Sequence, residues 1–267
     1  MSKPGTVFLM YHELALPNRA TCHREPGYTR YVVSASNFCA HMDRLKRDGW
    51  HAKNASQALQ SFDGKSVCIT FDDGCETDLL SAAPLLKELG FGATSYITVG
   101  FLGQPGYLSA SQVRSLSALG VEIGCHSQTH PYLPDVGDAR LHDETAGAKD
   151  RLEQIAGVPV EHFSCPGGRW DRRVVAAVKA ARFRSMATSR TEMNFADTDL
   201  FALARVVVLR DASEEFVVRA CSGRGLFGTQ LKEKARESAQ RVLGNSTYDS
   251  LRALLLGREE NAGSDQH

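Results

Sequence analysis

The sequence has no CxxC pair, and its cysteines are odd in number. These absences argue against a Cys₄ zinc site and against a disulfide framework, so we expect reduced thiols. Cys75, Cys125 and Cys165 lie beside motifs described below, where small buried packing residues are commoner than soft metal ligands. The seven cysteines are Cys22, Cys39, Cys68, Cys75, Cys125, Cys165 and Cys221.

The chain also lacks net charge and any long apolar run. Its 31 basic residues balance 31 acidic ones, so no excess positive charge points to nucleic acid or to an anionic membrane. No stretch approaches the roughly 20 apolar residues that a transmembrane helix needs. We therefore expect a cytoplasmic protein, unless a leader has been removed from the chain.

No GxGxxG motif follows a strand, which argues against a dinucleotide-binding fold. Instead, short apolar runs alternate with helical patterns, as in βα units. The expected strands are Val7–Tyr11, Val67–Phe71, Thr94–Val99, Val121–Cys125, His162–Cys165, Ser185–Thr188 and Ala204–Leu209. The expected helices are Asn37–Asp48, Leu79–Leu89, Ser111–Leu119, Ala139–Ala156, Arg172–Ala181 and Ser213–Cys221. This pattern predicts an α/β fold, a distorted or incomplete (β/α) barrel of about seven parallel strands.

The length of 267 residues and 42% hydrophobic content favour one main domain. We expect the barrel over residues 1–222, a helical extension over 223–258 and a disordered tail over 259–267. Two helices of the extension, 229–243 and 247–256, are expected to pack on the barrel, with oligomerisation, partner or membrane-surface contact as alternatives. Two loops are long enough to border a cleft: the polar segment Ala15–Arg30 and the segment Gly100–Tyr107, which is rich in glycine and proline.

The strongest local signal is Thr70-Phe71-Asp72-Asp73-Gly74, two adjacent carboxylates at the end of an apolar run. Two acids at the C-terminal mouth of a strand are costly unless a cation lies beside them, and ligands collect at this end of α/β folds. A helix N-cap followed by a first-turn acid is the alternative for the pair alone.

The second signal is the pair His126 and His130, which follows another predicted strand. On one helical turn, this i, i+4 spacing would direct both side chains to the same point. Two histidines and one of the two aspartates, Asp72 or Asp73, would form a site for a divalent ion with open positions for water and substrate. Such a site favours hydrolysis over the chemistry of non-haem iron oxygenases, whose usual scaffold is rich in β-structure.

Together these motifs resemble the polysaccharide deacetylase family with NodB homology, carbohydrate esterase family 4. The family's TFDDG motif stands intact at 70–74, and its HSxxH motif stands at 126–130. The resemblance implies that Asp72 is the catalytic base and that Asp73, His126 and His130 bind the metal. We expect Zn²⁺, with Co²⁺ or Ni²⁺ as alternatives.

The third family motif, RxPxG, is partial here, because Ser164 stands where the arginine would be. The resemblance implies that Pro166 and the N–H of Gly167 stabilise the oxyanion. Either Arg169 or Arg205 could replace the missing arginine and orient Asp72, and the sequence does not decide between them.

The late catalytic histidine of the family is absent, since beyond His162 the only histidine is His267. The early segment 7–13 resembles the opening of deacetylases whose motif order is circularly permuted, such as those acting on poly-N-acetylglucosamine. By this resemblance His12 protonates the leaving amine, although a strand-end histidine can also serve only as a cap. The aromatic side chains proposed as a floor for a sugar ring are Tyr11, Tyr107, Tyr132 and Trp170. The histidines expected to have ordinary structural or surface roles are His23, His41, His51, His142 and His162.

These observations predict a metal-dependent hydrolase that removes an N-acetyl or other N-acyl group from an amino sugar in a glycan or glycoconjugate. One alternative is an amidohydrolase acting on a small non-sugar amide, such as a ureide or cyclic imide. The other is a catalytically weak glycan-binding homologue, which the replacement of the arginine by Ser164 would explain.

Overall fold

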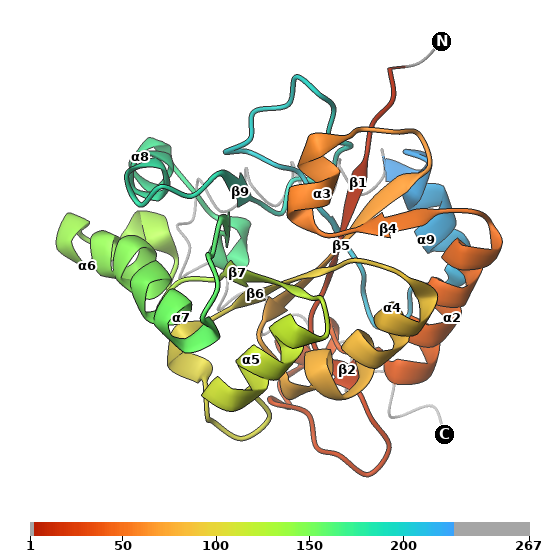
Figure 1. Cartoon of the computed structure of the whole chain (residues 1–267), viewed down its shortest axis with the longest axis horizontal. Helices are drawn as coiled ribbons and strands as arrows, with labels where there is room; N and C mark the ends of the chain where they lie inside the picture. The colour runs from red at the N-terminus through yellow and green to blue at the C-terminus, as the bar shows by residue number, and fades with distance from the viewer. Residues whose placement is uncertain (1–2, 227–267) are drawn as a thin grey trace, which may run out of the picture.

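The computed structural model describes residues 3–226, which form a curled parallel sheet with helices around its outside (Figure 1). Seven strands are paired in the order β10-β1-β5-β6-β7-β8-β9, and β4 pairs with the first half of β5. All of these pairs are parallel. The strands are β1 (Val7–Tyr11), β4 (His51–Lys53), β5 (Ser66–Asp73), β6 (Thr94–Ile97), β7 (Glu122–Cys125), β8 (His162–Ser164), β9 (Ser185–Ala187) and β10 (Val206–Val207).

The sheet curls far enough to bring its two edge strands close to each other. An isolated parallel bridge joins Ala187 of β9 to Leu203, only a few residues before β10. The amide of Thr188 also donates to the Leu203 carbonyl at 2.8 Å. The predicted distorted (β/α) barrel is therefore confirmed, with each of the seven predicted strands present in the main path of the sheet.

The helices follow the predicted pattern, since each predicted helix before residue 222 has a counterpart. The helices are α1 (Pro26–Thr29), α2 (Ala35–Arg47), α3 (Ala55–Gln60), α4 (Ala83–Leu89), α5 (Ala110–Ala118), α6 (Asp138–His142), α7 (Ala148–Ala156), α8 (Arg172–Ala180) and α9 (Glu214–Cys221). Two π-helical turns precede or join them, η1 (Asp78–Ala82) before α4 and η4 (Asp143–Gly147) between α6 and α7. Short 3₁₀ turns lie at Val99–Phe101, Leu133–Asp135 and Pro166–Gly168.

The helix ends show why these segments start and stop where they do. Asp171 accepts the amide of Val174 at 2.9 Å and caps α8, as a side-chain oxygen at this position is expected to do. Gly90 ends α4 with a φ of +68°, a left-handed conformation that glycine adopts without steric cost. Asp and Gly are residue types that commonly mark helix starts and stops, so the ends of these helices are encoded locally.

Some elements were not predicted. Part of the loop Ala15–Arg30 is ordered as α1, and the strand β2 (Leu14–Ala15) pairs in parallel with β3 (Val33–Ser34) as a separate two-stranded sheet. Strand β4 and helix α3 are too short to show a hydrophobic period. The cap of α3 was nevertheless visible in the sequence, because Asn54 and Gln57 form a reciprocal capping box.

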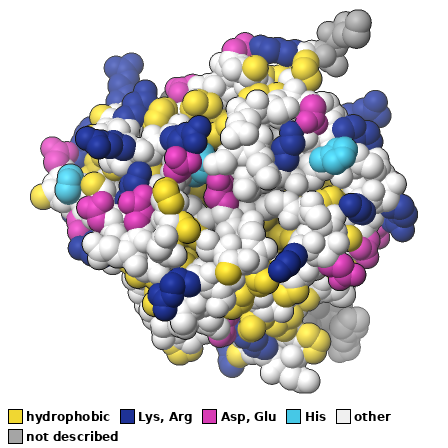
Figure 2. Space-filling model, in the orientation of Figure 1, with side chains coloured by type: hydrophobic (Ala, Val, Ile, Leu, Met, Phe, Trp, Pro, Cys, Tyr) yellow, Lys and Arg dark blue, Asp and Glu magenta, His cyan; other side chains and the backbone are white. Residues whose placement is uncertain are grey.

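The hydrophobic core lies between the sheet and the surrounding helices. Every residue of the central strand β5 is buried, which explains why this strand reads as a continuous apolar run until its two aspartates. On the face shown in Figure 2, basic and acidic side chains are interspersed, without a large area of one sign. Within residues 3–226, no helix is both long and apolar enough to cross a membrane. The predicted helices at 229–243 and 247–256 lie outside the described residues and stay predictions.

Candidate active site

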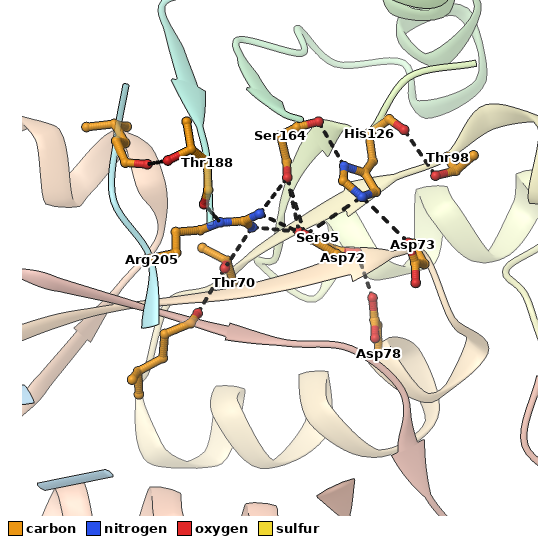
Figure 3. Close-up of polar contacts among 12 residues, drawn as sticks. Thr70, Asp72, Asp73, Asp78, Ser95, Thr98, His126, Ser164, Thr188 and Arg205 are labelled. Atoms are coloured by element: carbon orange, nitrogen blue, oxygen red, sulfur yellow. Dashed lines mark hydrogen bonds and ion pairs between the residues drawn. The ribbon is translucent and has the colours of Figure 1, made fainter. Parts of the chain in front are cut away.

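The paired aspartates are the last two residues of β5, at the C-terminal ends of the barrel strands (Figure 3). Both are buried, with 2% of Asp72 and 8% of Asp73 exposed. Neighbouring residues of a regular strand point to opposite faces, but Asp73 has a φ of +79° and Gly74 a φ of +81°. The strand therefore ends at Asp73, and both carboxylates lie near His126.

The histidine pair lies on a loop after β7 rather than on the helical turn that the spacing suggested. Ser127 and His130 both have positive φ values, +69° and +60°, which a right-handed helix does not contain. The hydroxyl of Ser127 accepts the amide of His130 at 3.0 Å and stabilises this compact loop. The expectation that both side chains converge was correct, but the expectation of a helical turn was wrong.

Two features outside the motif hold this loop in place. Glu144, on η4, is 2% exposed and accepts the amides of Gln128 and Thr129 at 2.9 and 2.8 Å. On the other side, the amide of Gly100 donates to the Gln128 carbonyl at 2.7 Å, and a Cβ at Gly100 would lie 2.7 Å from the same oxygen. Glu144 belongs to none of the sequence motifs, although an acid on the inner face of a predicted helix is a recognisable signal.

Asp73, His126 and His130 bring three donor atoms within 4.8 Å of one another, the one such group found among residues 3–226. The Nε2 atoms of His126 and His130 lie 3.6 and 3.5 Å from Oδ1 of Asp73, too far for hydrogen bonds. This buried oxygen accepts no hydrogen bond from the described part of the chain. A buried carboxylate oxygen without a donor, facing two imidazoles, fits a divalent cation.

The environment of His126 gives it the form that a metal ligand needs. Its Nδ1 lies 2.8 Å from the carbonyl oxygen of Ser164, so Nδ1 carries the proton and Nε2 presents its lone pair towards the aspartates. Burial lowers the pKa of His126 to about 4, although Asp72 acts in the opposite direction. The imidazole is therefore neutral at neutral pH.

Asp72 is bound by a buried arginine from a distant part of the chain. The two terminal nitrogens of Arg205 lie 2.7 and 2.8 Å from the two carboxylate oxygens of Asp72 (Figure 3). The same guanidinium donates to the hydroxyl of Ser164 at 2.8 Å and to the carbonyl of Thr188 at 2.9 Å. Burial opposes ionisation of Asp72, but the charge of Arg205 overcomes it and holds the pKa of Asp72 well below its usual range.

This geometry distinguishes the two arginines that the sequence left open. Arg205 is 0% exposed and contacts Asp72 directly, whereas the guanidinium of Arg169 lies over the ring of Tyr132 at 3.6 Å from its centroid. Ser164 takes part in the same network, since its hydroxyl also lies 3.3 Å from Asp72. A bidentate contact to Asp72 is thus made from position 205, not from position 164 or 169.

His12 directly follows β1, the strand that pairs with β5, and lies at the same end of the sheet. Its ring stacks on that of Tyr31 at 4.9 Å between centroids. Its buried Nδ1 has no hydrogen-bond partner among the described residues. In the register of β1 and β5, Tyr11 lies opposite Phe71, so His12 and Asp72 are the next residues of two paired strands.

The partial third motif forms a tight turn after β8. Pro166 is buried, and Gly167 has a φ of +61°. A Cβ at Gly167 would lie 2.8 Å from the ring of Tyr132, so both the backbone conformation and the close approach require glycine.

The aromatic residues proposed as a sugar floor do not all lie at the surface of the site. Tyr11 is fully buried in the core between Phe38 and Phe71, so its assignment as a sugar platform was wrong. Tyr107 is 6% exposed, and its hydroxyl lies 3.0 Å from His23. Trp170 is half-buried and packs against the core of the barrel.

Asp78 is a buried acid next to this site that the sequence analysis did not consider. Its Oδ2 accepts the hydroxyl of Ser95 at 2.7 Å, while its Oδ1 lacks a partner within residues 3–226. Burial, together with the nearby charge of Asp73, raises the pKa of Asp78 well above its usual range. The surroundings of Asp78 therefore disfavour its ionised form.

Comparison with known families agrees with this site. Residues 60–186 match the model of the polysaccharide deacetylase family, and this segment contains Asp72, Asp73, His126 and His130. Over this segment the family resemblance inferred from the motifs is confirmed. Strand β1 and Arg205 lie outside the matched segment, yet both contribute to the same end of the barrel.

Individual relatives extend this finding. A protein of Bacillus subtilis strain 168 described as putative polysaccharide deacetylase YxkH is 26% identical over 213 residues, which cover 77% of this chain and 72% of that protein. A chitooligosaccharide deacetylase of Azorhizobium caulinodans is 31% identical over 126 residues, 46% of this chain and 58% of that protein. The chain thus spans little more than half the length of the second relative.

Among solved structures, the fold is similar to that of Streptococcus pyogenes deacetylase PplD in complex with acetate. The TM-score is 0.73 at 20% identity, and the similarity covers 82% of this chain and 99% of that one. At this identity the likeness concerns the fold, which agrees with the distorted barrel described above.

Proposed function

We propose that the protein is a divalent-metal-dependent hydrolase that removes the N-acetyl group from an amino sugar of a glycan or glycoconjugate. The observation that carries this proposal is the partnerless oxygen of Asp73 facing His126 and His130, beside a second carboxylate, Asp72, that Arg205 holds in place. The match to the polysaccharide deacetylase family and the likeness to a chitooligosaccharide deacetylase support an acetylated amino sugar as substrate.

Asp73, His126 and His130 are the residues that would hold the ion. Zn²⁺ fits a set of two imidazoles and one carboxylate best, and Co²⁺ or Ni²⁺ would suit the same donors. A divalent ion in this position activates water at neutral pH and polarises the acyl carbonyl. The hydrogen bond from His126 to the Ser164 carbonyl orients this ligand before any ion binds.

Asp72 would accept the proton of the attacking water. Arg205 keeps its carboxylate ionised at neutral pH and fixes both oxygens, so the base has the correct protonation state and orientation before substrate enters. In this proposal Arg205 supplies the function of the arginine that Ser164 replaces. That assignment removes the reason for regarding the protein as a catalytically weak binding homologue.

His12 would donate a proton to the departing nitrogen as the C–N bond breaks, giving acetate and the free amine. Its unpartnered Nδ1 and its position after β1, at the same end of the sheet as Asp72, support this role. The N–H of Gly167, in the turn that follows Pro166, would donate to the developing oxyanion. Tyr107 and Trp170 are proposed substrate contacts, with Trp170 the more accessible of the two.

The test is acetate release by the full chain, loaded with Zn²⁺, from a panel of substrates. The panel contains acetylated chitooligosaccharides, a nucleotide-linked N-acetylamino sugar, and a ureide and a cyclic imide as small amides. We expect acetate from one of the sugars. Hydrolysis of the small amides alone would contradict the sugar assignment, and tight Zn²⁺ and glycan binding without hydrolysis would indicate a binding protein.

Substitution of the base separates chemistry from metal binding. Asp72→Asn should lower turnover by roughly 10²- to 10⁴-fold, the usual contribution of a general base, while the Zn²⁺ content stays at the wild-type level. Metal content and acetate release measured on the same preparation give both values. Unimpaired turnover in Asp72→Asn would overturn the proposed role of this residue.

A further inference from the structure

Two cysteine thiols lie against each other beside the candidate active site. The Sγ atoms of Cys22 and Cys75 are 3.8 Å apart, although the residues are 53 positions apart in the sequence. Cys75 is fully buried and directly follows Gly74, whereas Cys22 is half-buried in the loop between β2 and α1. The proposed hydrolysis uses neither thiol.

The loop that carries Cys22 is fastened to a buried acid. The amide of Cys22 donates to both oxygens of Glu13, at 2.9 and 3.1 Å, and the hydroxyl of Tyr28 donates to the same carboxylate at 2.9 Å. Glu13 is 1% exposed and directly follows His12. These contacts hold both sides of the loop next to the end of β1.

Further contacts keep Cys22 close to Cys75. Arg19 binds Glu76, the neighbour of Cys75, at 2.7 Å and donates to the carbonyl of Gly106 at 3.3 Å. On its other side, Cys22 packs so closely on Gly106 that a Cβ there would lie 2.6 Å from the Cys22 sulfur. The two thiols are therefore held together by ordered structure on both sides.

We propose that Cys22 and Cys75 form a reversible disulfide that ties the loop to the end of β5 and lowers turnover at the active site. The oxidant is a low-molecular-weight disulfide. The Cys22 sulfur attacks it, one thiol leaves, and a mixed disulfide forms on Cys22; the Cys75 sulfur then attacks the Cys22 sulfur and releases the second thiol. Two protein thiols and one small disulfide thus give one protein disulfide and two small thiols, which carry away both protons.

The difference in exposure sets this order. A small disulfide can reach the half-buried Cys22, while Cys75 is buried and its sulfur contacts the Cys22 sulfur and the Tyr28 hydroxyl. The other cysteines that the structure describes as buried lack this route to the solvent. Those residues are Cys68, Cys125, Cys165 and Cys221.

The effect on the site follows from geometry and depends on the proposed function. A disulfide bond is about 2.0 Å long, so the two sulfurs have to approach well beyond their present contact. Cys75 lies two residues after Asp73. The intervening Gly74 packs closely on Ile97, since a Cβ built on Gly74 would lie 3.0 Å from Cγ2 of Ile97. The shift therefore reaches the Asp73 carboxylate. A misplacement of about 1 Å in an active site can cost up to roughly 10²-fold, and we expect a loss of about tenfold.

The experiment uses the full Zn²⁺-loaded chain, first reduced and then equilibrated with oxidised glutathione. Peptide mapping by mass spectrometry should find a Cys22–Cys75 linkage, and acetate release should fall about tenfold and return after dithiothreitol. The oxidised protein should also be cleaved more slowly by trypsin after Arg24, an exposed residue next to the tethered position. Cys22→Ser should abolish the linkage and make turnover insensitive to the oxidant.

Cys39→Ser is the matched control, because Cys39 is also half-buried but lies on α2, where its sulfur is 3.6 Å from Oδ2 of Asp43. This variant should respond to oxidation as the wild type does. A linkage between other cysteines, no linkage, or a linked protein with unchanged turnover would each overturn the proposal. If the reduced protein releases acetate from no substrate, the proposed function fails, whereas the mapping and the trypsin cleavage still decide whether the disulfide forms and tethers the loop.

Discussion

The two ends of the barrel each contain a buried histidine beside an acid, but they differ in how their polar atoms are partnered. At the N-terminal end, four polar residues each begin a strand: Thr94 (β6), Glu122 (β7), His162 (β8) and Ser185 (β9). His162 has hydroxyls of Ser56 and Ser185 at 2.8 Å from its two nitrogens, and Glu122 accepts the hydroxyl of Thr94 at 2.6 Å. This cluster satisfies its own hydrogen bonds.

At the C-terminal end the same kinds of residue leave atoms without partners. Asp73 ends β5 and His126 follows β7, yet Oδ1 of Asp73 and Nδ1 of His12 have no hydrogen-bond partner within residues 3–226. A buried polar group without a partner costs free energy, so it persists where a bound group completes it. The comparison shows that a buried histidine indicates a functional site only when polar atoms around it lack hydrogen-bond partners among the described residues.

The largest contrast is expected when one histidine is removed from each end. His126→Ala should lose both Zn²⁺ binding and turnover, since it removes one of three ligands and the proposed chemistry needs the ion. His162→Ala should keep Zn²⁺ content and turnover per folded molecule but lower the free energy of unfolding by about 1–3 kcal/mol, because Ser56 and Ser185 lose a buried partner.

Metal content, acetate release and urea unfolding of both variants measure this contrast. Metal content should be expressed per folded molecule. A loss of metal in His162→Ala on that basis would show that the two ends of the barrel are not independent. Retained metal and turnover in His126→Ala would remove the basis for the proposed ligand set.

A smaller effect is expected from Arg205→Lys, which acts only at the C-terminal end. Lysine keeps the positive charge but cannot form two parallel hydrogen bonds to Asp72, so the base loses its fixed orientation. We expect turnover to fall by about 10²-fold with little change in KM or Zn²⁺ content. A change in KM alone would point to a substrate contact instead of a positioning role.

Acid pH should lower the stability of both ends of the barrel through their buried histidines, and that of the C-terminal end also through Asp72 at lower pH. Burial lowers the pKa of His162 below its usual 6.5, so the unfolded state binds more protons there, and the stability contributed by this end is complete above pH 6.5 and declines below it. The pKa of Asp72 is also lowered, but from 3.8, so its contribution is lost only as pH falls below about that value. Unfolding measured between pH 7 and 3 should therefore show a decline below pH 6.5 that is smaller in His162→Gln than in the wild type, because His126, whose pKa is lowered to about 4, still contributes to it. An unchanged decline in that variant would contradict the assignment.

The fold was largely predictable because the signals that define it are local. Each of the seven strands of the main path is an apolar run that is long enough to be recognised, and helix ends are marked by residues such as Asp171 and Gly90. Strand β4 was not predicted because its three residues, one of them exposed, are too few to show a hydrophobic periodicity. Local sequence patterns therefore predict the longer strands and helices. Short strands and helices depend on partners that are distant in the sequence, so they are missed.

The site was predictable to the extent that its residues lie in contiguous motifs. The motifs brought Asp72, Asp73 and both histidines to attention, but the spacing of His126 and His130 suggested a helical turn where the structure has a loop with two positive φ angles. The partner of Asp72 could not be derived in this way. Arg205 is 133 positions away, and only the curled sheet brings it to the carboxylate.

Ser164→Ala is expected to have the smallest effect, and it tests how the C-terminal end works without the family arginine. The substitution removes one hydroxyl that lies 2.8 Å from Arg205 and 3.3 Å from Asp72, but it leaves the backbone carbonyl that orients His126. Loss of one such hydrogen bond is worth about 1 kcal/mol, which corresponds to a roughly fivefold fall in turnover with Zn²⁺ content unchanged. A fall as large as that of Arg205→Lys would mean that the hydroxyl, and not the bidentate arginine, sets the position of the base.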